Sequence, residues 1–287
     1  MLIPATVPPH KRDEFHNNYA TLTKDTSKLL LFVADQKMQS LNEEFFGPDL
    51  PAGISDPEHI FKIASQSNVG GLSVHLGLMS RYGQQYSNIN FVPKLDGKTN
   101  LTPTDPYSQQ IWSVADAVDV ARNGNMKLCG VGYTVYVGSE YEREMLTEAA
   151  TTIKEAHAHG LVTILWMYPR GHKVKNPYDP NIIAGVAGLG ATLGADFVKI
   201  TEPDTGPHDL IYAVQAAGNT KVLVAGGPAR SPEDLIKRVE KQLYYGTAGC
   251  VIGRNIFQHP LKEAITIANN LAETIYQHLD EDNYEAL

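Results

Sequence analysis

Residues 161–200 read LVTILWMYPR GHKVKNPYDP NIIAGVAGLG ATLGADFVKI. An apolar run at 162–168 precedes a polar loop, a segment rich in small residues, and a second apolar run at 197–201. Short, continuous apolar runs are typical of parallel strands that are buried on both faces. The glycines at 188–194 precede the second run, so they indicate a helix packed closely on a sheet rather than a dinucleotide-binding loop. This stretch therefore predicts a strand–helix–strand unit.

The same alternation extends in both directions from this unit. The runs that we predict to be strands span residues 29–34, 71–75, 91–95, 128–135, 162–168, 197–201, 221–225 and 249–253. Eight such runs, most of them followed by a helical segment, imply a parallel sheet. We predict an α/β fold, a (β/α)8 TIM barrel that forms a single domain over residues 1–287; a doubly wound open sheet is the alternative. We expect an N-terminal extension over about residues 1–27 and a C-terminal helix over about residues 260–280.

Three serines are placed to begin helices. Ser55 and Ser139 are each followed three residues later by glutamate, which is the pattern of a capping box. Ser231 is followed by Pro232, a residue that is favoured at the first position of a helix. We therefore expect helices to start after all three.

Composition narrows the class of protein. The 287 residues carry a net charge of −8 and show no basic stripe, which argues against nucleic acid or an anionic membrane as the main partner. No apolar run approaches the roughly 20 residues of a membrane span, and the N-terminus lacks the apolar core of a signal peptide. The two cysteines, Cys129 and Cys250, lie in apolar runs and are expected to be buried thiols. We predict a cytosolic protein.

The side chains at the carboxyl ends of the strands are the candidates for chemistry, because these ends form the active face of such barrels. Lys199 lies in the run Asp-Phe-Val-Lys-Ile, and a closed barrel has no edge strand on which a lysine could reach solvent. Burial lowers the pKa of a lysine and leaves some neutral amine that can attack a carbonyl. Lys199 is therefore the predicted catalytic residue.

Other strand ends supply polar groups. Asp35 ends the first run and is followed by a long segment of the length that often covers a site. Trp166 and Tyr168 alternate onto one face of the fifth run, so they form a predicted pocket wall, and Tyr168 can transfer protons. Gly226 and Gly227 end the seventh run, and Gly253 and Arg254 end the eighth, where such barrels commonly hold a phosphate.

A metal centre is not indicated. His157 and His159 are two residues apart on a predicted helix and face different directions, and no other cluster has zinc-ligand spacing. Bond breaking next to a carbonyl carbon needs an electron sink, either a metal or an iminium. Lysine without metal ligands favours the iminium, so we predict no metal and no cofactor.

With these residues in place, the chain resembles the archaeal-type class I fructose-1,6-bisphosphate aldolases, a family that also occurs in bacteria. The similar segments run from about residue 29 to 258 and include LLLFVADQK, GYTVYVGSEYE, WMYPRG, ADFVK, AGGP and GRNI. The resemblance implies a Schiff-base role for Lys199 and proton transfer by Tyr168, and it implies that Asp35 helps to position the substrate hydroxyls and to manage protons. It also implies that Trp166 lines the site, that the glycine pairs and Arg254 hold the phosphate at C1 of the ketose, and that the protein is a homo-oligomer.

The chain departs from the family after the first strand, where many relatives have Asp-His-Gly and this chain has Asp35-Gln36-Lys37. The residues that would bind the distal phosphate therefore do not carry over. Lys37, Arg170 and Lys173 are the candidates for this role. The alternative for each is a solvated surface charge.

Three other functions fit the same residues. A related Schiff-base aldolase or transferase would act on another phosphorylated ketose or a dicarbonyl, and a substrate panel separates it. A sugar-phosphate isomerase or epimerase would retain activity without Lys199. A non-catalytic sugar-phosphate sensor needs the phosphate loops but not a buried amine, so the co-occurrence of Lys199, Tyr168 and Asp35 argues against it.

Overall fold

The computed structural model describes residues 2–48, 50–101 and 105–278. Within them, one sheet runs in the order β6-β3-β2-β1-β11-β10-β9-β8-β7, and all its ladders are parallel. Its strands are β1 (Leu29–Val33), β2 (Gly71–Ser73), β3 (Asn90–Phe91), β6 (Lys127–Leu128), β7 (Gly130–Val137), β8 (Val162–Pro169), β9 (Phe197–Ile200), β10 (Lys221–Ala225) and β11 (Gly249–Ile252).

The two ends of this order are halves of one strand. Only Cys129 separates β6 from β7; its amide donates to Phe91 O over 2.9 Å, and its carbonyl accepts from Val162 N over 3.0 Å. The sheet therefore closes into a barrel. All eight predicted runs are strands, the (β/α)8 prediction is confirmed, and the open-sheet alternative is wrong.

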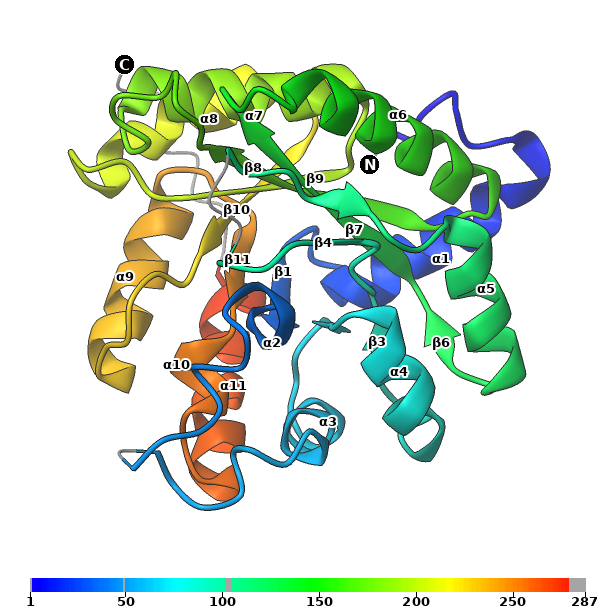
Figure 1. Cartoon of the computed structure of the whole chain (residues 1–287), viewed down its shortest axis with the longest axis vertical. Helices are drawn as coiled ribbons and strands as arrows, with labels where there is room; N and C mark the ends of the chain where they lie inside the picture. Colours follow the sequence, from blue (N-terminus) through cyan, green and yellow to red (C-terminus); the bar gives the residue numbers. More distant parts are fainter. Residues whose placement is uncertain (1, 49, 102–104, 279–287) are drawn as a thin grey trace.

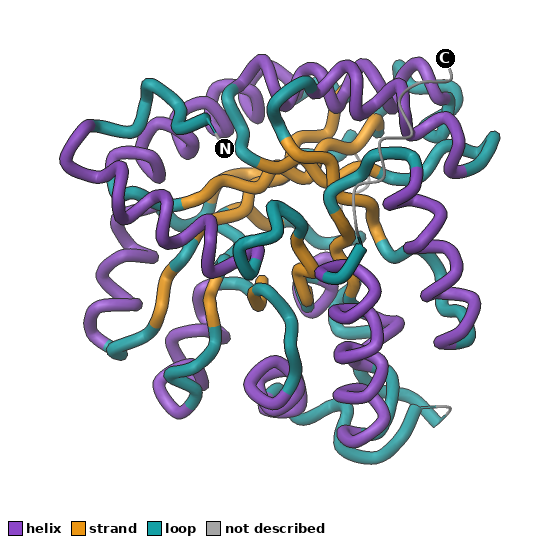
Figure 2. Tube along the Cα trace, turned by 180° about the vertical axis from the view of Figure 1, so that it is seen from behind, coloured by secondary structure: helices purple, strands orange, loops and turns teal. Residues whose placement is uncertain are grey.

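The helices surround the strands, as Figure 1 and the reverse view in Figure 2 show. They are α1 (Arg12–Thr23), α2 (Gln36–Gln39), α3 (Glu58–Gln66), α4 (Leu76–Tyr82), α5 (Val114–Asn123), α6 (Glu142–Ala158), α7 (Pro180–Leu193), α8 (Leu210–Ala217), α9 (Pro232–Tyr244), α10 (Arg254–Phe257) and α11 (Leu261–Tyr276), with short 3-10 turns η1 (Pro9–Lys11), η2 (Gly83–Gln85) and η3 (Pro207–Asp209). A small antiparallel pair, β4 (Asp96–Gly97) and β5 (Gln109–Gln110), follows β3. The predicted C-terminal helix is α11; residues 279–280 of that prediction lie outside the described residues.

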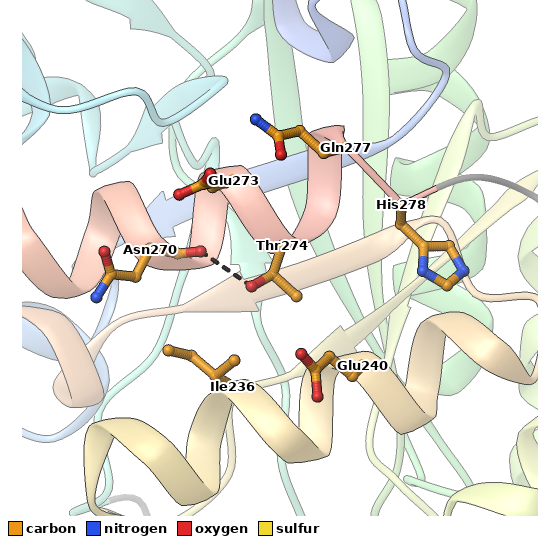
Figure 3. A pocket seen from close by; sticks show the side chains of 7 residues that line it. All are labelled: Ile236, Glu240, Asn270, Glu273, Thr274, Gln277 and His278. Carbon is orange, nitrogen blue, oxygen red and sulfur yellow. Dashed lines mark hydrogen bonds between the residues drawn. The ribbon is translucent and has the colours of Figure 1, made fainter.

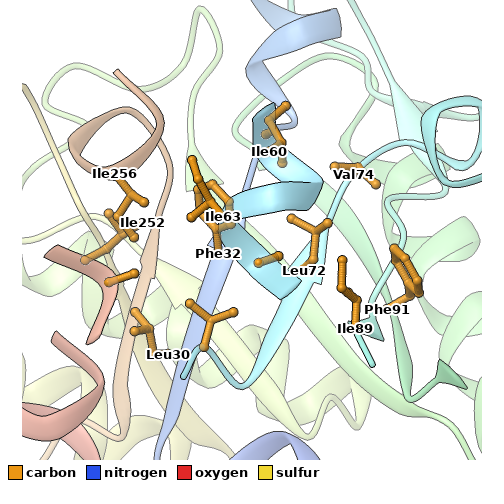
Figure 4. Packing of buried hydrophobic residues seen from close by; sticks show 14 of the residues in the cluster. Leu30, Phe32, Ile60, Ile63, Leu72, Val74, Ile89, Phe91, Ile252 and Ile256 are labelled. Atoms are coloured by element: carbon orange, nitrogen blue, oxygen red, sulfur yellow. The ribbon is translucent and has the colours of Figure 1, made fainter. Parts of the chain in front are cut away.

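Alternation along the strands divides the core into an inner and an outer part. In β1, Leu29 and Leu31 belong to the apolar cluster that fills the barrel together with Phe197. Leu30 and Phe32 point outward into a second cluster under the helices, where Figure 4 shows Phe32 beside Ile63 of α3. Residues of one strand that are two apart therefore share an environment, and Lys199 has the inward parity of Phe197.

The N-terminal extension closes the end of the barrel where the strands begin. Phe15, Tyr19 and Leu22 of α1 join the inner cluster, and Tyr19 stacks on Phe197 with ring centres 5.3 Å apart. At the same end, His157 Nδ1 lies 2.6 Å from Thr6 Oγ1. This apolar plug leaves the carboxyl ends of the strands as the polar face of the barrel.

Helices start after all three predicted serines, but only one of these serines caps its helix. Ser231 caps α9 by accepting from Asp234 N over 3.2 Å, as expected. Ser55 does not cap α3, where Asp56 Oδ1 instead accepts from Glu58 N over 3.0 Å. Ser139 does not form a capping box on α6, because its hydroxyl donates to Pro106 O and accepts from Tyr141 N. A neighbouring carboxylate thus replaces the serine at α3, and α6 begins without a side-chain cap.

The predictions for the small residues and cysteines are confirmed. Gly190 lies in α7 so close to the sheet that a Cβ would come within 2.3 Å of Val198 Cγ1. Cys129 and Cys250 are buried and not in a disulfide. In the parts of the chain that the structure describes, no helix combines the length and apolar character needed to cross a membrane.

Candidate active site

Lys199 lies on the inner face of β9 and is only 5% exposed. Burial lowers the pKa of its amine to about 8; the charge of Asp35 opposes this shift, and the charges of Arg170 and Arg254 add to it. At neutral pH a pKa near 8 leaves about a tenth of the amine unprotonated, whereas an ordinary lysine would have far less than a hundredth. An amine with this neutral fraction is able to act as a nucleophile.

Two aromatic rings of β8 flank this amine. The centre of the Trp166 ring is 5.3 Å from Lys199 Nζ, and the centre of the Tyr168 ring is 5.6 Å away. The parallel ladder places Trp166 directly beside Lys199, and the alternation of β8 brings Tyr168 to the same face. Burial raises the pKa of the Tyr168 phenol above its usual value, and Asp35 raises it further. Tyr168 therefore holds a proton that it can donate.

Asp35 lies just beyond the carboxyl end of β1, at the start of α2, and is 2% exposed. Its charge raises the pKa values of both Lys199 and Tyr168. The structure thus gathers the three predicted catalytic residues at one end of the barrel, from β1, β8 and β9.

The predicted phosphate loops are joined to each other. Asn255 Nδ2 donates to Gly226 O over 3.2 Å and to Pro228 O over 3.1 Å, while its Oδ1 accepts from Arg230 N. Gly227 has a φ of +67°, a conformation that favours glycine, and a Cβ there would meet no atom within 4 Å. Asn255 was part of the GRNI motif, but the sequence did not mark it as a residue that links the two loops.

Gly253 and Arg254 begin α10, whose first N–H groups have no partner within the helix. A Cβ on Gly253 would lie 2.7 Å from Val33 O, so only glycine fits between β1 and β11. Arg254 is close enough for its charge to lower the pKa of Lys199. These loops border the lysine from the side of β10 and β11.

The three candidates for the distal phosphate are placed differently. The guanidinium of Arg170 lies 5.3 Å from the centre of the Tyr168 ring, at the mouth of the site. Lys37 Nζ instead lies 3.8 Å from the centre of the Phe45 ring and 3.4 Å from Asn42 Oδ1. Lys173 is exposed, and its charge is not among those that shift the pKa of Lys199. The structure brings Arg170, but not Lys37, into contact with the residues around Lys199.

Sequence reasoning missed a second buried lysine. Lys94 follows β3, is fully buried, and forms an ion pair with Asp96, whose Oδ1 is 2.8 Å from its Nζ. It also donates to Thr134 Oγ1 and lies 4.2 Å from the centre of the Trp166 ring. Lys94 and Asp96 are two residues apart, which is the spacing of neighbours on one face of an extended chain, so the sequence did contain a signal for this pair.

A pocket of about 330 Å3 lies away from these residues, between α9 and α11 on the outside of the barrel. Figure 3 shows Ile236 and Glu240 of α9 facing Asn270, Glu273 and Thr274 of α11. Carboxylates line it and lysine and arginine do not, so it is a poor site for a phosphate. Among the described residues, no three His, Cys, Asp or Glu side chains are grouped as metal ligands would be.

Comparison with known proteins places the chain among aldolases. The sequence profile of the DeoC/LacD family aldolases matches residues 29–259. A fructose-bisphosphate aldolase/6-deoxy-5-ketofructose 1-phosphate synthase of Methanocaldococcus jannaschii is 46% identical over 93% of this chain and 87% of its own length. A class 1 fructose-bisphosphate aldolase of Thermoproteus tenax is 36% identical over 77% of this chain and 81% of its own length.

Solved structures agree. A fructose-bisphosphate aldolase from Slackia heliotrinireducens superimposes with a TM-score of 0.93 at 38% identity, covering 97% of this chain and 91% of its own. An archaeal fructose-1,6-bisphosphate aldolase, solved with its catalytic Lys covalently bound to the carbinolamine intermediate, gives a TM-score of 0.80 at 31% identity over 91% of this chain and 99% of its own.

Proposed function

Because the chain belongs to the DeoC/LacD family of aldolases, we propose that it is a class I fructose-bisphosphate aldolase. It reversibly cleaves fructose 1,6-bisphosphate to dihydroxyacetone phosphate and glyceraldehyde 3-phosphate. The observation that carries the proposal is the buried amine of Lys199, whose pKa is about 8, between Trp166 and Tyr168 at the polar end of the barrel. The named relatives and solved structures support the same substrate.

The reaction begins when the neutral amine of Lys199 attacks C2 of the ketose. The resulting carbinolamine loses water to give a protonated iminium. The iminium accepts the electron pair of the C3–C4 bond as that bond breaks, once the C4 hydroxyl has lost its proton. Glyceraldehyde 3-phosphate leaves, and the remaining enamine is protonated at C3 and hydrolysed to dihydroxyacetone phosphate and free Lys199.

Tyr168 and Asp35 manage the protons. The raised pKa of Tyr168 keeps its phenol protonated before substrate binds, so it first acts as a donor, for instance to the departing water. The carboxylate of Asp35, whose charge acts on both Tyr168 and Lys199, is the acceptor to which the C4 proton is relayed. The two residues serve as a donor–acceptor pair across the iminium.

The C1 phosphate binds beside Gly226, Gly227, Gly253 and Arg254. The N–H groups at the start of α10 and the guanidinium of Arg254 supply hydrogen bonds and positive charge. Fixing this phosphate holds C2 near Lys199 and turns the attack into an effectively intramolecular step. Arg170 is the candidate for the second phosphate, because it lies at the mouth beside Tyr168.

A second function has one specific observation in its favour. The Methanocaldococcus jannaschii relative is also named a 6-deoxy-5-ketofructose 1-phosphate synthase. Cleaving such a sugar between C3 and C4 gives dihydroxyacetone phosphate and a three-carbon dicarbonyl, so no second phosphate has to be bound. Lys37, one candidate for that second phosphate, is engaged with Asn42 and Phe45 instead. The same Lys199 chemistry would serve both reactions.

The proposal also covers the cellular compartment, the oligomeric state and the direction of the reaction. We place the enzyme in the cytosol as a homo-oligomer that takes phosphorylated sugars and neither nucleic acid nor membrane as its partner. Condensation in the reverse direction would serve gluconeogenesis, and cleavage would serve glycolysis.

A substrate panel tests the choice between the two functions. The wild-type protein is given dihydroxyacetone phosphate with either glyceraldehyde 3-phosphate or a three-carbon dicarbonyl aldehyde, and product formation is followed for each pair. The proposal expects the phosphorylated aldehyde to be used with the higher kcat/KM. Use of the dicarbonyl alone would establish the second function instead.

A further inference from the structure

The segment that follows β1 packs against α10 and is hydrogen-bonded to the residue after it. The rings of Phe45 and Phe257 stack with centres 4.2 Å apart, and both side chains are at most 1% exposed. Gln258 Nε2 donates to the carbonyl of Glu44 over 3.0 Å. The backbone of Glu44 is therefore held against the helix that carries Arg254.

The Glu44 carboxylate lies on the guanidinium of Arg254. Glu44 Oε1 is 3.2 Å from Arg254 Nη2, with the two side chains 17% and 40% exposed. Its second oxygen, Oε2, is buried and has no hydrogen-bond partner among the described residues. Burial raises the pKa of Glu44, Arg254 lowers it, and Asp35 and Glu43 raise it further. The carboxylate is poorly satisfied and sits where a phosphate would meet Arg254.

We propose that Glu44 sets the affinity of the site for phosphorylated ligands, as an internal carboxylate that competes with the phosphate of every ligand for Arg254. The inference rests on the proposed function, because that proposal places the C1 phosphate at Arg254.

The competition follows from charge and from the fixed backbone. A phosphate dianion at Arg254 would lie within a few ångströms of the Glu44 carboxylate, and like charges repel strongly in a partly buried site. Because Phe45 and Gln258 hold the segment, Glu44 can turn its side chain but cannot withdraw with the loop. The cost therefore falls on every phosphorylated ligand.

This cost is common to the substrate, the product and inorganic phosphate. Glu44 therefore weakens the binding of all three without changing the ratio of their affinities. It lowers the fraction of the sites that any one of them occupies at a given concentration.

The test compares Glu44→Gln with the wild-type protein and with Glu43→Gln, a matched control that removes the same charge from the adjacent, exposed residue. Calorimetric titration gives the Kd of inorganic phosphate, and a cleavage assay gives KM and kcat for fructose 1,6-bisphosphate. For Glu44→Gln we expect Kd and KM to fall by about three- to tenfold, with kcat unchanged. For Glu43→Gln we expect less than about a twofold change, because exposed charges are screened.

A second comparison, in a protein that lacks the Arg254 guanidinium, tests whether Glu44 affects phosphate binding through Arg254. In an Arg254→Gln protein, adding Glu44→Gln should change the Kd of phosphate much less than it does in the wild type, because the shared partner is gone. A Kd that rises in Glu44→Gln would overturn the proposal, since Glu44 would then be orienting Arg254 for phosphate. An unchanged Kd would overturn it as well.

The two proposals fail separately. If the wild type does not cleave fructose 1,6-bisphosphate while Glu44→Gln still binds phosphate more tightly, the proposed function is wrong and Glu44 remains a competitor. If the wild type cleaves the sugar while the Kd values of the two proteins match, the function holds and the competition does not. Thermal unfolding of each variant confirms that the compared proteins are folded.

Discussion

The two buried lysines of the barrel, Lys94 and Lys199, have similar burial and share the Trp166 ring, but they differ in their polar partners. Lys94 contacts a carboxylate, Asp96, and a hydroxyl, Thr134. Lys199 contacts the faces of Trp166 and Tyr168 and has no carboxylate within ion-pair distance in the described chain. Burial lowers the pKa of both amines; Asp96 opposes that effect most strongly at Lys94, and the more distant Asp35 opposes it at Lys199.

From this difference we infer a structural role for Lys94 and a reactive role for Lys199. A paired ammonium with satisfied hydrogen bonds is stable in the interior, and its lone pair is not available. An amine that faces aromatic rings has less to gain from its proton, so a useful fraction is neutral. The two sites therefore differ in the partners of the amine and not in its depth of burial.

The largest expected effect is on catalysis. Lys199→Met removes the nucleophile, and we expect kcat for fructose 1,6-bisphosphate cleavage to fall by at least about a thousandfold. Circular dichroism should show an unchanged fold, since methionine fits an apolar site of this size. Residual cleavage near the wild-type rate would assign the chemistry to acid–base residues and favour an isomerase-like enzyme.

Asp96→Asn should remove the ion pair of Lys94 and destabilise the protein. The change leaves Lys94 charged and buried without its counter-ion, and we expect the free energy of unfolding to fall by about 3–5 kcal/mol in urea titrations. Adding Lys94→Met should restore much of it. Asp119→Asn, which removes the partner of Arg122 in an exposed pair, is the control and should cost at most about 1 kcal/mol. Equal losses in the two variants would mean that Lys94 is solvated.

Lys199 should also make stability depend on pH. Between pH 8 and the ordinary lysine pKa of 10.5, the unfolded chain keeps a proton that folded Lys199 has lost. The free energy of unfolding therefore rises with pH across this window, by about 3 kcal/mol, and the gain disappears as pH falls through 8. Because tyrosines titrate in the same range, the measured quantity is the difference between wild type and Lys199→Met. A flat difference would mean that Lys199 has an ordinary pKa.

The smallest expected effect comes from Arg170, whose charge lowers the pKa of Lys199. Arg170→Gln should move the midpoint of the pH–rate profile for Schiff-base trapping upward by a few tenths of a pH unit, because an exposed charge is strongly screened. Lys173→Gln is the matched control from the same loop. If both variants shift the midpoint equally, the effect reflects net charge and not the position of Arg170.

The strands were predictable because the barrel buries both faces of each one. Short, continuous apolar runs such as 162–168 and 221–225 are typical of strands that are buried on both faces. Lys199 was recognisable as a cation inside another such run, 197–201. The closure through Cys129 was not visible, since it depends on hydrogen bonds to Phe91 and Val162.

The environment of Lys94 was missed for a physical reason. Lys94 lies inside the predicted run 91–95, but a proline precedes it and β3 itself ends at Phe91, so the run did not show that its side chain is buried. Its burial comes from Thr134 and Trp166, which lie 40 and 72 positions further along the chain. Likewise, the pairing of Lys37 with Asn42 and Phe45 depends on the path of a loop that periodicity does not describe.

Borohydride trapping tests the central claim most directly. The protein is incubated with fructose 1,6-bisphosphate and sodium borohydride, and intact mass and peptide mapping locate any adduct. The account predicts an adduct with the mass of reduced dihydroxyacetone phosphate on Lys199 and none on Lys94. An unmodified protein that nonetheless binds the sugar, or an adduct on Lys94, would contradict it.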